Sequence, residues 1–170
     1  KAVTCIFAWD VKKSASFEHE NMMLMADRLV KIGGLKDRAA NRVYEIFKLL
    51  QLETEKYDPG FWSQRSIVEG ILSLWTGSHN PDVFKCWAEF FGNIFQALDF
   101  NADGYITFDE YIVFWKALNF DPTLAWVQFN YIDTNQDGKI SLEEFTETYY
   151  DYFRNYTDNG NRFFGPLLDF

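Results

Sequence analysis

The chain has 170 residues, a formal net charge of -9 and a pI near 4.7. This length allows one domain or two small lobes with a sizeable core, and no apolar run reaches the ~20 residues that span a bilayer. The acidic excess makes nucleic acid and anionic membranes poor partners and a cation a good one.

Apolar residues at helical spacing predict helices that come in pairs along the first half of the chain. In chain order these helices cover residues 1–9, 17–31, 35–55 and 61–75. The turn-rich segment from Gly77 to Pro81 then separates an N-terminal lobe, residues 1–76, from a C-terminal lobe, residues 82–170. The organisation is therefore two lobes, each built from two helix pairs.

Two segments of the second half, residues 99–110 and 133–144, place oxygen-bearing residues at the spacing of an EF-hand calcium loop. Such a loop uses side-chain oxygens from positions 1, 3 and 5, a backbone carbonyl from position 7 and a bidentate Glu from position 12. Gly104 and Gly138 fall at position 6, where the loop turns sharply with positive φ. The predicted ligands are Asp99, Asn101, Asp103, Tyr105 and Glu110 in the first segment and Asp133, Asn135, Asp137, Lys139 and Glu144 in the second.

An acidic solvated turn is the alternative, because Asp, Asn and Gly are ordinary turn residues. That alternative explains the start of each segment but not its end. Position 8 is apolar in both segments (Ile106 and Ile140), which suits the short two-stranded contact of paired loops, and an aromatic residue follows each terminal Glu. Both segments also follow helical apolar patterns, the second of which begins at the N-cap Asp121 and Pro122. We therefore predict two Ca²⁺ sites, at which Mg²⁺ competes.

The loop pattern fails in the first half of the chain. If Phe17 takes position 8 of the first loop, Asp10 takes position 1, and positions 3, 5, 6 and 12 are Lys12, Ser14, Ala15 and Asn21. If Phe61 takes position 8 of the second loop, positions 1, 3, 5, 6 and 12 are Thr54, Lys56, Asp58, Pro59 and Arg65. We predict that neither loop binds an ion. The predicted fold is all-α, with four EF-hand units in two paired lobes that form one compact globule.

Two consensus loops, two degraded ones and the tail from Tyr149 to Leu167 together resemble the invertebrate sarcoplasmic calcium-binding protein and calexcitin group. That group shares its fold with the calcium-regulated photoproteins and the coelenterazine-binding protein. The resemblance implies an intracellular Ca²⁺ buffer or signal modulator. Members usually keep a functional first loop, and this chain departs from them there.

The photoproteins carry a His near the C-terminus beside a Tyr and a Trp. The resemblance therefore predicts a His at that place if this chain has photoprotein chemistry. The histidines of this chain are His19, in the degraded first loop, and His79, in the turn between the lobes. We find no Ser-His-Asp set, phosphate loop or zinc-type cluster either. The chain is therefore not expected to be an enzyme.

Aromatic residues make up 19% of the chain, which favours a large core but also suits a cavity for a small apolar ligand between the lobes. The candidate lining residues are Trp9, Trp62, Trp75, Trp87, Trp115 and Trp126. A Ca²⁺-regulated carrier of such a ligand is thus one alternative function. A Ca²⁺ sensor that acts on a protein target is another, although Met22, Met23 and Met25 lie far from the predicted loops.

The two cysteines, Cys5 and Cys86, have neither metal-ligand spacing nor the density of a disulfide scaffold. The apolar N-terminus is too short and interrupted for a signal peptide. We expect reduced thiols, a cytoplasmic monomer, and further residues before Lys1.

Overall fold

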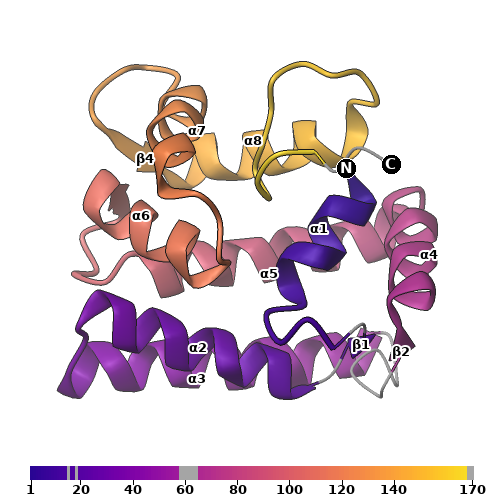
Figure 1. Cartoon of the computed structure of the whole chain (residues 1–170), viewed down its shortest axis with the longest axis horizontal. Helices are drawn as coiled ribbons and strands as arrows, with labels where there is room; N and C mark the ends of the chain where they lie inside the picture. The colour runs from indigo at the N-terminus through magenta and orange to yellow at the C-terminus, as the bar shows by residue number, and fades with distance from the viewer. Residues whose placement is uncertain (15, 18, 58–64, 168–170) are drawn as a thin grey trace.

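The computed structural model describes residues 1–14, 16–17, 19–57 and 65–167 (Figure 1). These residues form eight α-helices and four short strands. The helices are α1 (Ala2–Trp9), α2 (His19–Gly33), α3 (Asp37–Tyr57), α4 (Ile67–Ser78), α5 (Pro81–Leu98), α6 (Phe108–Ala117), α7 (Ala125–Ile132) and α8 (Leu142–Arg154). The strands are β1 (Ser16–Phe17), β2 (Arg65–Ser66), β3 (Tyr105–Thr107) and β4 (Lys139–Ser141).

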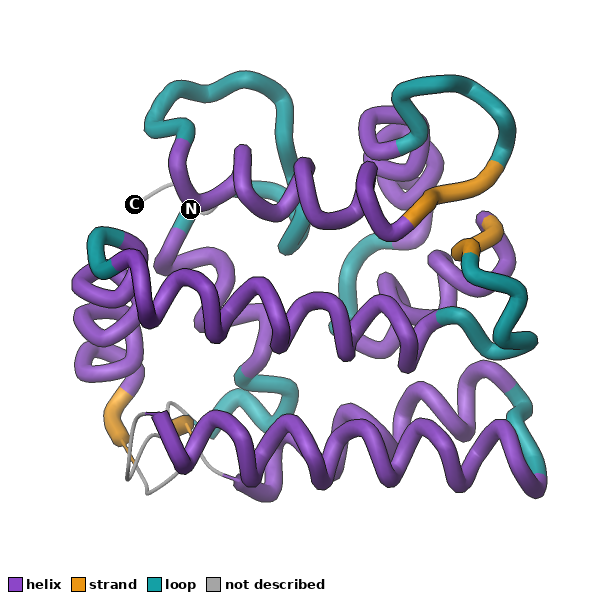
Figure 2. Tube along the Cα trace, turned by 180° about the vertical axis from the view of Figure 1, so that it is seen from behind, coloured by secondary structure: helices purple, strands orange, loops and turns teal. Residues whose placement is uncertain are grey.

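Each strand lies between two consecutive helices, so the described chain consists of four helix–loop–helix units. β1 pairs antiparallel with β2, and β3 pairs antiparallel with β4. In the second pair Ile106 lies opposite Ile140, as predicted for position 8 of paired loops. Figure 2 shows the two small sheets at opposite ends of the molecule. The predicted all-α fold with four units in two pairs is confirmed.

The helices stack in layers, with α2 and α3 below, α5 in the middle and α8 above in Figure 1. Helix α5 contacts both α3 and α8, and α2 contacts α6. Buried apolar residues from both halves, including Met25, Phe47, Phe91 and Phe145, belong to one core cluster. The two pairs therefore share a core instead of folding as separate lobes.

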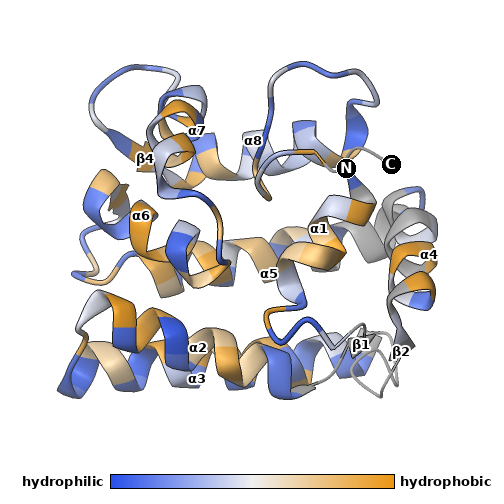
Figure 3. Ribbon diagram, in the orientation of Figure 1, coloured by the Kyte–Doolittle hydropathy of each residue, from blue (hydrophilic) through white to orange (hydrophobic). Residues whose placement is uncertain are grey.

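The hydropathy of the helices follows these layers (Figure 3). Helices α1 and α5 are apolar along much of their length, whereas α2 and α3 carry a hydrophilic face on the outside of the molecule. Among the described residues, no helix combines the length and the apolar character that crossing a membrane requires.

The start of α4 differs from the sequence prediction, which extended a helix from residue 61 to residue 75. Instead α4 begins at Ile67, because Ser66 caps it: the Ser66 hydroxyl accepts from the Glu69 amide, and the Glu69 carboxylate accepts from the Ser66 amide at 2.8 Å. Phe61 lies outside the described residues. The capping box of Ser66 and Glu69, and not the apolar residue Phe61, therefore marks the start of this helix.

Helix α7 also starts later than its N-cap suggests. Asp121 does accept a hydrogen bond from the Thr123 amide at 2.9 Å, but the turn that follows, Pro122–Leu124, is a 3-10 helix that we label η1. The α-helix proper begins at Ala125. The apolar residues that lead into the last loop, Ala125, Phe129 and Ile132, are all buried.

Candidate calcium-binding site

The first C-terminal loop begins where α5 ends, and its position-1 carboxylate organises the turn. Asp99 is buried, and its two oxygens accept from the Asp103 amide at 3.0 Å and the Gly104 amide at 2.9 Å. Asn101 Oδ1 accepts from the Asp103 amide at 3.0 Å. Gly104 has φ +89, the left-handed conformation that glycine adopts at no steric cost. The side chains at positions 1 and 3 therefore hold the backbone amides at positions 5 and 6 by hydrogen bonds.

The second C-terminal loop repeats this arrangement residue by residue. Asp133 is buried and accepts from the Asp137 amide at 3.1 Å and the Gly138 amide at 2.9 Å. Asn135 Oδ1 accepts from the Asp137 amide at 2.8 Å, and Gly138 has φ +83. The equivalence extends to position 4, where Ala102 and Gln136 both have positive φ.

The Glu at position 12 closes each loop from its far end. Glu110 Oε1 accepts from the Phe100 amide at 2.9 Å, and its Oε2 accepts from the Thr107 amide at 2.8 Å. Thr107 in turn caps α6, since its hydroxyl accepts from the Glu110 amide. The carboxylate that a metal would need therefore lies on the first turn of a helix and is held against the start of the loop.

Glu144 is held by more donors than Glu110. Its Oε1 accepts from the Thr134 amide and hydroxyl, both at 3.0 Å, and from the Asn135 amide, while Ser141 bonds to its Oε2 at 2.9 Å. Burial raises the pKa of Glu144, but the hydrogen bonds from Ser141, Asn135 and Thr134 outweigh it, so this pKa lies below its ordinary value. Glu144 is thus an ionised, preorganised acceptor.

The position-7 residues, whose carbonyls are the predicted ligands, interact through their side chains on the outside of the paired loops. The Lys139 ammonium lies 4.2 Å from the centroid of the Tyr105 ring, a cation–π contact across the two strands. The Lys139 ammonium thus lies against a residue of the neighbouring loop. The positive charge of Lys139 therefore lies outside the group of oxygens that are the predicted ligands.

The first loop of the chain keeps the EF-hand backbone without the ligands. Asp10 is buried, its Oδ1 accepts from the Ser14 amide at 2.9 Å, and Lys13 at position 4 has φ +54. These features match those of the two C-terminal loops. However, position 3 is Lys12, whose ammonium forms a salt bridge with Glu20. The alignment of Asp10 with position 1 agrees with this geometry.

The alignment of the second loop was wrong by four residues. β1 pairs Phe17 with Arg65, and a position-8 residue pairs with a position-8 residue in the C-terminal sheet, so Arg65 takes position 8. Glu69, which forms a capping box with Ser66, then takes position 12, as Glu110 and Glu144 do. Position 1 becomes Asp58, outside the described residues. Positions 3 and 5, Gly60 and Trp62, carry no side-chain oxygen.

Two arginines of the N-terminal half contact the first C-terminal unit, and the sequence reading missed both. Arg42 of α3 donates to the carbonyl of Asp99 at 3.2 Å. Arg28 of α2 donates to the carbonyls of Ala117 at 2.6 Å and Lys116 at 3.0 Å, at the carboxyl end of α6. A guanidinium suits this helix end, where carbonyls lack intrahelical partners. No local pattern predicts such contacts, because the partners are 57 or more residues apart.

Comparison with known proteins identifies the kind of domain that the C-terminal half contains. Residues 89–150, which contain both C-terminal loops, match the sequence model of the EF-hand domain pair. This match identifies residues 89–150 as an EF-hand domain pair, and it indicates calcium binding. The prediction of EF-hand units in the C-terminal half is thereby confirmed. The narrower assignment to the sarcoplasmic calcium-binding protein and calexcitin group stays a prediction.

Two proteins from species of Renilla are similar to this chain. The luciferin-binding protein of Renilla reniformis is 33% identical over 79 residues, which are 44% of this chain and 43% of that protein. This chain therefore matches less than half the length of that curated relative. The coelenterazine-binding protein of Renilla muelleri, in its calcium-loaded apo form, superimposes with a TM-score of 0.84 at 23% identity and covers 98% of this chain and 93% of that chain.

A ctenophore photoprotein has the same fold at lower similarity. Magnesium-loaded apo-berovin superimposes with a TM-score of 0.65 at 14% identity, covering 89% of this chain and 86% of that chain, and all three calcium-binding loops of that protein bind magnesium. At these identities the two superpositions show the fold alone.

Proposed function

We propose that this protein binds two Ca²⁺ ions, one in residues 99–110 and one in residues 133–144, and acts as a cytoplasmic calcium buffer or signal modulator. The observation that carries the proposal is that the same loop structure occurs twice. In each copy, a buried Asp at position 1 and a Glu at position 12 accept hydrogen bonds from backbone amides of the loop, and the Glu is part of a capping box. The proposed ligands are the ten residues named from the sequence, with Tyr105 and Lys139 contributing backbone carbonyls.

We propose that the side-chain oxygens of each loop move together when the loop binds an ion. Among the described residues, no three acidic, thiol or imidazole groups converge closely enough to hold a metal. The reason is local, because the carboxylates accept hydrogen bonds from their own loop, as Glu110 does from Phe100 and Thr107. The ion would replace part of these bonds, and the surrounding donors keep the carboxylates within reach. All the groups involved are hard oxygen donors, which suit Ca²⁺ and allow Mg²⁺ to compete.

The N-terminal loops are proposed to be structural. Lys12 puts a cation at a ligand position of the first loop, and Gly60 and Trp62 offer no side-chain oxygen to the second. Isothermal titration at physiological ionic strength with ~1 mM Mg²⁺ tests the whole assignment, since buffers bind Ca²⁺ at roughly 10⁻⁹ to 10⁻⁸ M and sensors at roughly 10⁻⁷ to 10⁻⁵ M. We expect two sites. A stoichiometry of zero or of four contradicts the proposal.

A second candidate function is that of a Ca²⁺-regulated carrier of a small apolar ligand. The names of the similar proteins favour it, since one is a luciferin-binding protein and another a coelenterazine-binding protein. One feature of the core also favours it: Tyr111 is buried, and its hydroxyl has no hydrogen-bond partner among the described residues. Burial accordingly raises the pKa of Tyr111.

The tryptophans nominated as a lining divide into different environments. Trp9 and Trp115 are buried, Trp87 is half-buried, and Trp126 is exposed. Trp115 donates its indole N–H to the Asp121 carbonyl at 2.6 Å, as a core residue would. Trp62 and the side chain of Trp75 lie outside the described residues. Only Trp9, Trp87 and Trp115 are therefore retained as described candidates for contact with an internal ligand.

Tryptophan quenching by coelenterazine, with Ca²⁺ and with chelator, tests the carrier function. A ligand that the apo form holds more tightly must lower the calcium affinity by the same factor. If coelenterazine neither quenches the fluorescence nor shifts the melting temperature in either state, the aromatic set is core alone.

The sensor function has less support. A sensor opens on binding Ca²⁺ and exposes an apolar groove, whereas Met22 and Met25 are buried in α2 and Met23 packs against the core. A buffer should give little calcium-dependent fluorescence of an apolar dye, and a large rise would favour the sensor. We propose no catalytic role. His79 is exposed and forms a hydrogen bond of 3.1 Å with the Tyr156 hydroxyl, away from both C-terminal loops.

A further inference from the structure

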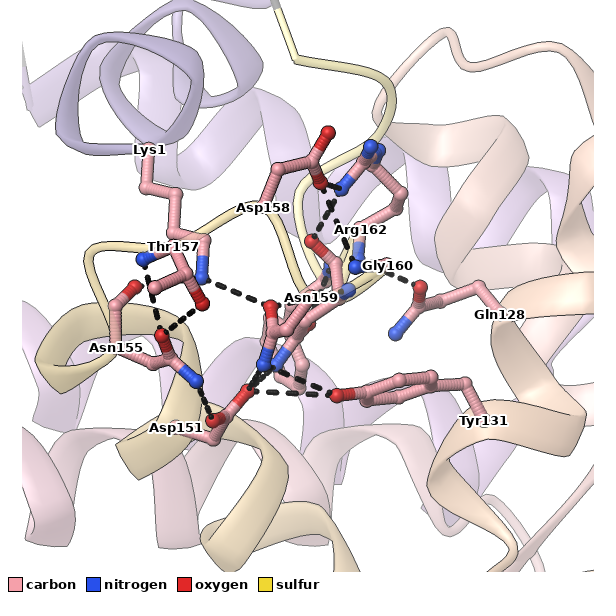
Figure 4. Close-up of polar contacts among 12 residues, drawn as sticks. Lys1, Gln128, Tyr131, Asp151, Asn155, Thr157, Asp158, Asn159, Gly160 and Arg162 are labelled. Carbon is pink, nitrogen blue, oxygen red and sulfur yellow. Dashed lines mark hydrogen bonds and ion pairs between the residues drawn. The ribbon is translucent and has the colours of Figure 1, made fainter.

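The tail that follows α8, residues 155–167, turns back and contacts both helices that flank the second C-terminal loop (Figure 4). Helix α7 ends directly before Asp133, the position-1 residue of that loop, and the first turn of α8 carries Glu144, the position-12 residue. The angle between α7 and α8 therefore sets how these two proposed ligands lie relative to each other. A contact that ties α7 to α8 bears directly on this loop.

The tail is fixed to α8 through Asp151 and Asn161. Asp151 lies in the last turn of α8. Its carboxylate accepts hydrogen bonds from three side-chain amides of the tail, those of Asn155 at 3.1 Å, Asn159 at 2.7 Å and Asn161 at 2.8 Å. Asn161 is fully buried, and its amide also donates to the Thr148 carbonyl at 2.9 Å. Asn161 is thus bonded to α8 at two points.

The same stretch of the tail is fixed to α7. The backbone amide of Arg162 donates to Oε1 of Gln128, a buried residue of α7, at 2.7 Å. In the last turn of α7, the Tyr131 hydroxyl accepts from the Asn159 side-chain amide at 3.3 Å. Figure 4 shows these side chains converging from α7, α8 and the tail. Residues 159–162 therefore form a strap across the two helices.

Asp151 is the charged centre of this strap. Burial raises the pKa of Asp151, but the hydrogen bonds from the three tail amides and the positive charge of Lys1 outweigh burial, so this pKa lies below its ordinary value. An ionised carboxylate offers only acceptors and can serve all three amides at once, and hydrogen bonds to a charged group are the stronger ones. Removing the charge should therefore loosen the strap without removing a loop ligand.

The first C-terminal loop is supported from another direction. It lies between α5 and α6, and Arg42 of α3 donates to its Asp99 carbonyl at 3.2 Å. The hydrogen bonds of the strap described above go to α7 and α8. A change in the strap can thus be read as a difference between the two loops.

We propose that the strap of residues 159–162 holds α7 and α8 at the angle that calcium binding needs, with Asp151 and Asn161 as positioning residues for the ion in residues 133–144. This inference rests on the proposed calcium function and adds a regulating element to one of its two sites. Because linkage is reciprocal, a strap that strengthens calcium binding at this loop is itself tightened by calcium. The tail is then held more firmly in the calcium-loaded protein than in the calcium-free one.

Asp151→Asn is the first test, because it keeps the shape of the side chain and removes its charge. The backbone amides of Gly104 and Gly138, which donate to the position-1 carboxylates, report on each loop separately in ¹H–¹⁵N spectra. In calcium titrations buffered with chelator, we expect the affinity of residues 133–144 to fall ~3- to 10-fold, the value of about one hydrogen bond. The affinity of residues 99–110 should stay unchanged.

The matched control is Glu147→Gln. It makes the same charge change at an exposed position one turn earlier on α8, and it should leave both loops as in the parent protein.

Hydrogen exchange at the backbone amide of Arg162 tests the reciprocal effect. This amide donates to Gln128, so in the parent protein it should exchange more slowly with Ca²⁺ than with chelator. Glu144→Gln, which weakens the ion site between α7 and α8, should remove this difference. Glu110→Gln, which weakens the other site, should keep it.

An equal loss of affinity at both loops in Asp151→Asn, or no loss at either, would overturn the proposal, since the tail would then only stabilise the fold. So would exchange of the Arg162 amide that calcium does not change. If Asp151→Asn does not fold, the exchange measurements in the parent protein, Glu110→Gln and Glu144→Gln still decide. If neither glycine responds to Ca²⁺ in the parent protein, the calcium assignment fails and this inference fails with it, whereas the other outcomes leave that assignment standing.

Discussion

The first loop and the two C-terminal loops follow the same backbone course but differ in chemistry. In all three, a buried Asp at position 1 accepts from the amide at position 5, and position 4 has positive φ. In the first loop, however, positions 3 and 12 are Lys12 and Asn21, where the C-terminal loops have Asn and Glu. The loops thus share the position-1 Asp and the turn, and they differ in the proposed ligands at positions 3 and 12.

The N-terminal and C-terminal units are also in contact with each other. The two N-terminal units pack their helices onto α5 and α6, and Arg42 and Arg28 reach the first C-terminal unit. The N-terminal pair therefore supports the C-terminal pair through its helices and these two arginines. Four predictions follow from this division, given from the largest expected effect to the smallest.

Removing the Glu at position 12 should make a C-terminal loop behave like the first one. Glu110→Gln and Glu144→Gln should each weaken Ca²⁺ binding at their own loop by ~100-fold or more, because losing an outer-shell partner alone costs 10- to 100-fold. Titration calorimetry measures this. The controls are Asp109→Asn and Glu143→Gln, which remove a charge from an exposed neighbour. If Glu110→Gln leaves both sites at full affinity, Glu110 is not a ligand.

Supplying the missing oxygens should make the first loop behave like a C-terminal one. The triple change Lys12→Asp, Ala15→Gly, Asn21→Glu gives the loop acidic residues at positions 1, 3 and 12 and Gly at position 6. We expect the stoichiometry to rise from two ions to three, because the backbone around Asp10 is already in the EF-hand form. Lys13→Asp, which makes the charge change of Lys12→Asp at position 4 instead of position 3, should not add a site. No gain of an ion in the triple variant would mean that the loop backbone, too, is unsuited.

Cutting the contact between the two halves should lower stability without removing a site. Arg28→Ala leaves the carbonyls of Lys116 and Ala117 without this partner, and we expect the free energy of unfolding to fall by ~1.5–3 kcal/mol, a typical value for hydrogen bonds to a charged group. Chemical denaturation in the presence of chelator measures it. Lys31→Ala, an exposed change on the same helix, should be within ~0.5 kcal/mol of the parent protein. Equal stability of the two variants would show that α2 packs on α6 through apolar contacts alone.

The smallest effect should distinguish the two C-terminal loops from each other. Thr134→Val removes a hydroxyl that donates to Glu144 and has no counterpart at Phe100 in the other loop. Affinity at residues 133–144 should fall by at most ~10-fold, the lower end of outer-shell effects, with residues 99–110 unaffected. Phe100→Leu is the control at the same loop position. A fall in affinity at both loops would instead indicate coupling through the Ile106–Ile140 strand pair.

The sequence by itself determined the parts of this protein that depend on residues close together in the chain. The C-terminal loops and the helices that flank them follow from spacing within each unit, because an EF-hand unit is a local structure. The strand contact at Ile106 and Ile140 follows from the same position, position 8, in the two loops. The degraded first loop was aligned correctly for the same reason, since Asp10 and Lys12 lie within it. Both N-terminal loops were aligned on one apolar residue apiece, Phe17 and Phe61; the strand pairing of Phe17 with Arg65 agrees with the first choice and contradicts the second.

Only the tertiary structure decided the rest. The pairing of β1 with β2 gave the second loop its register through residues 48 and 50 positions apart in the chain. The sharing of one core by both halves and the arginine contacts depend on segments brought together from far along the chain. No local pattern encodes such contacts, because burial and hydrogen-bond satisfaction are set by whichever surfaces the whole fold places side by side.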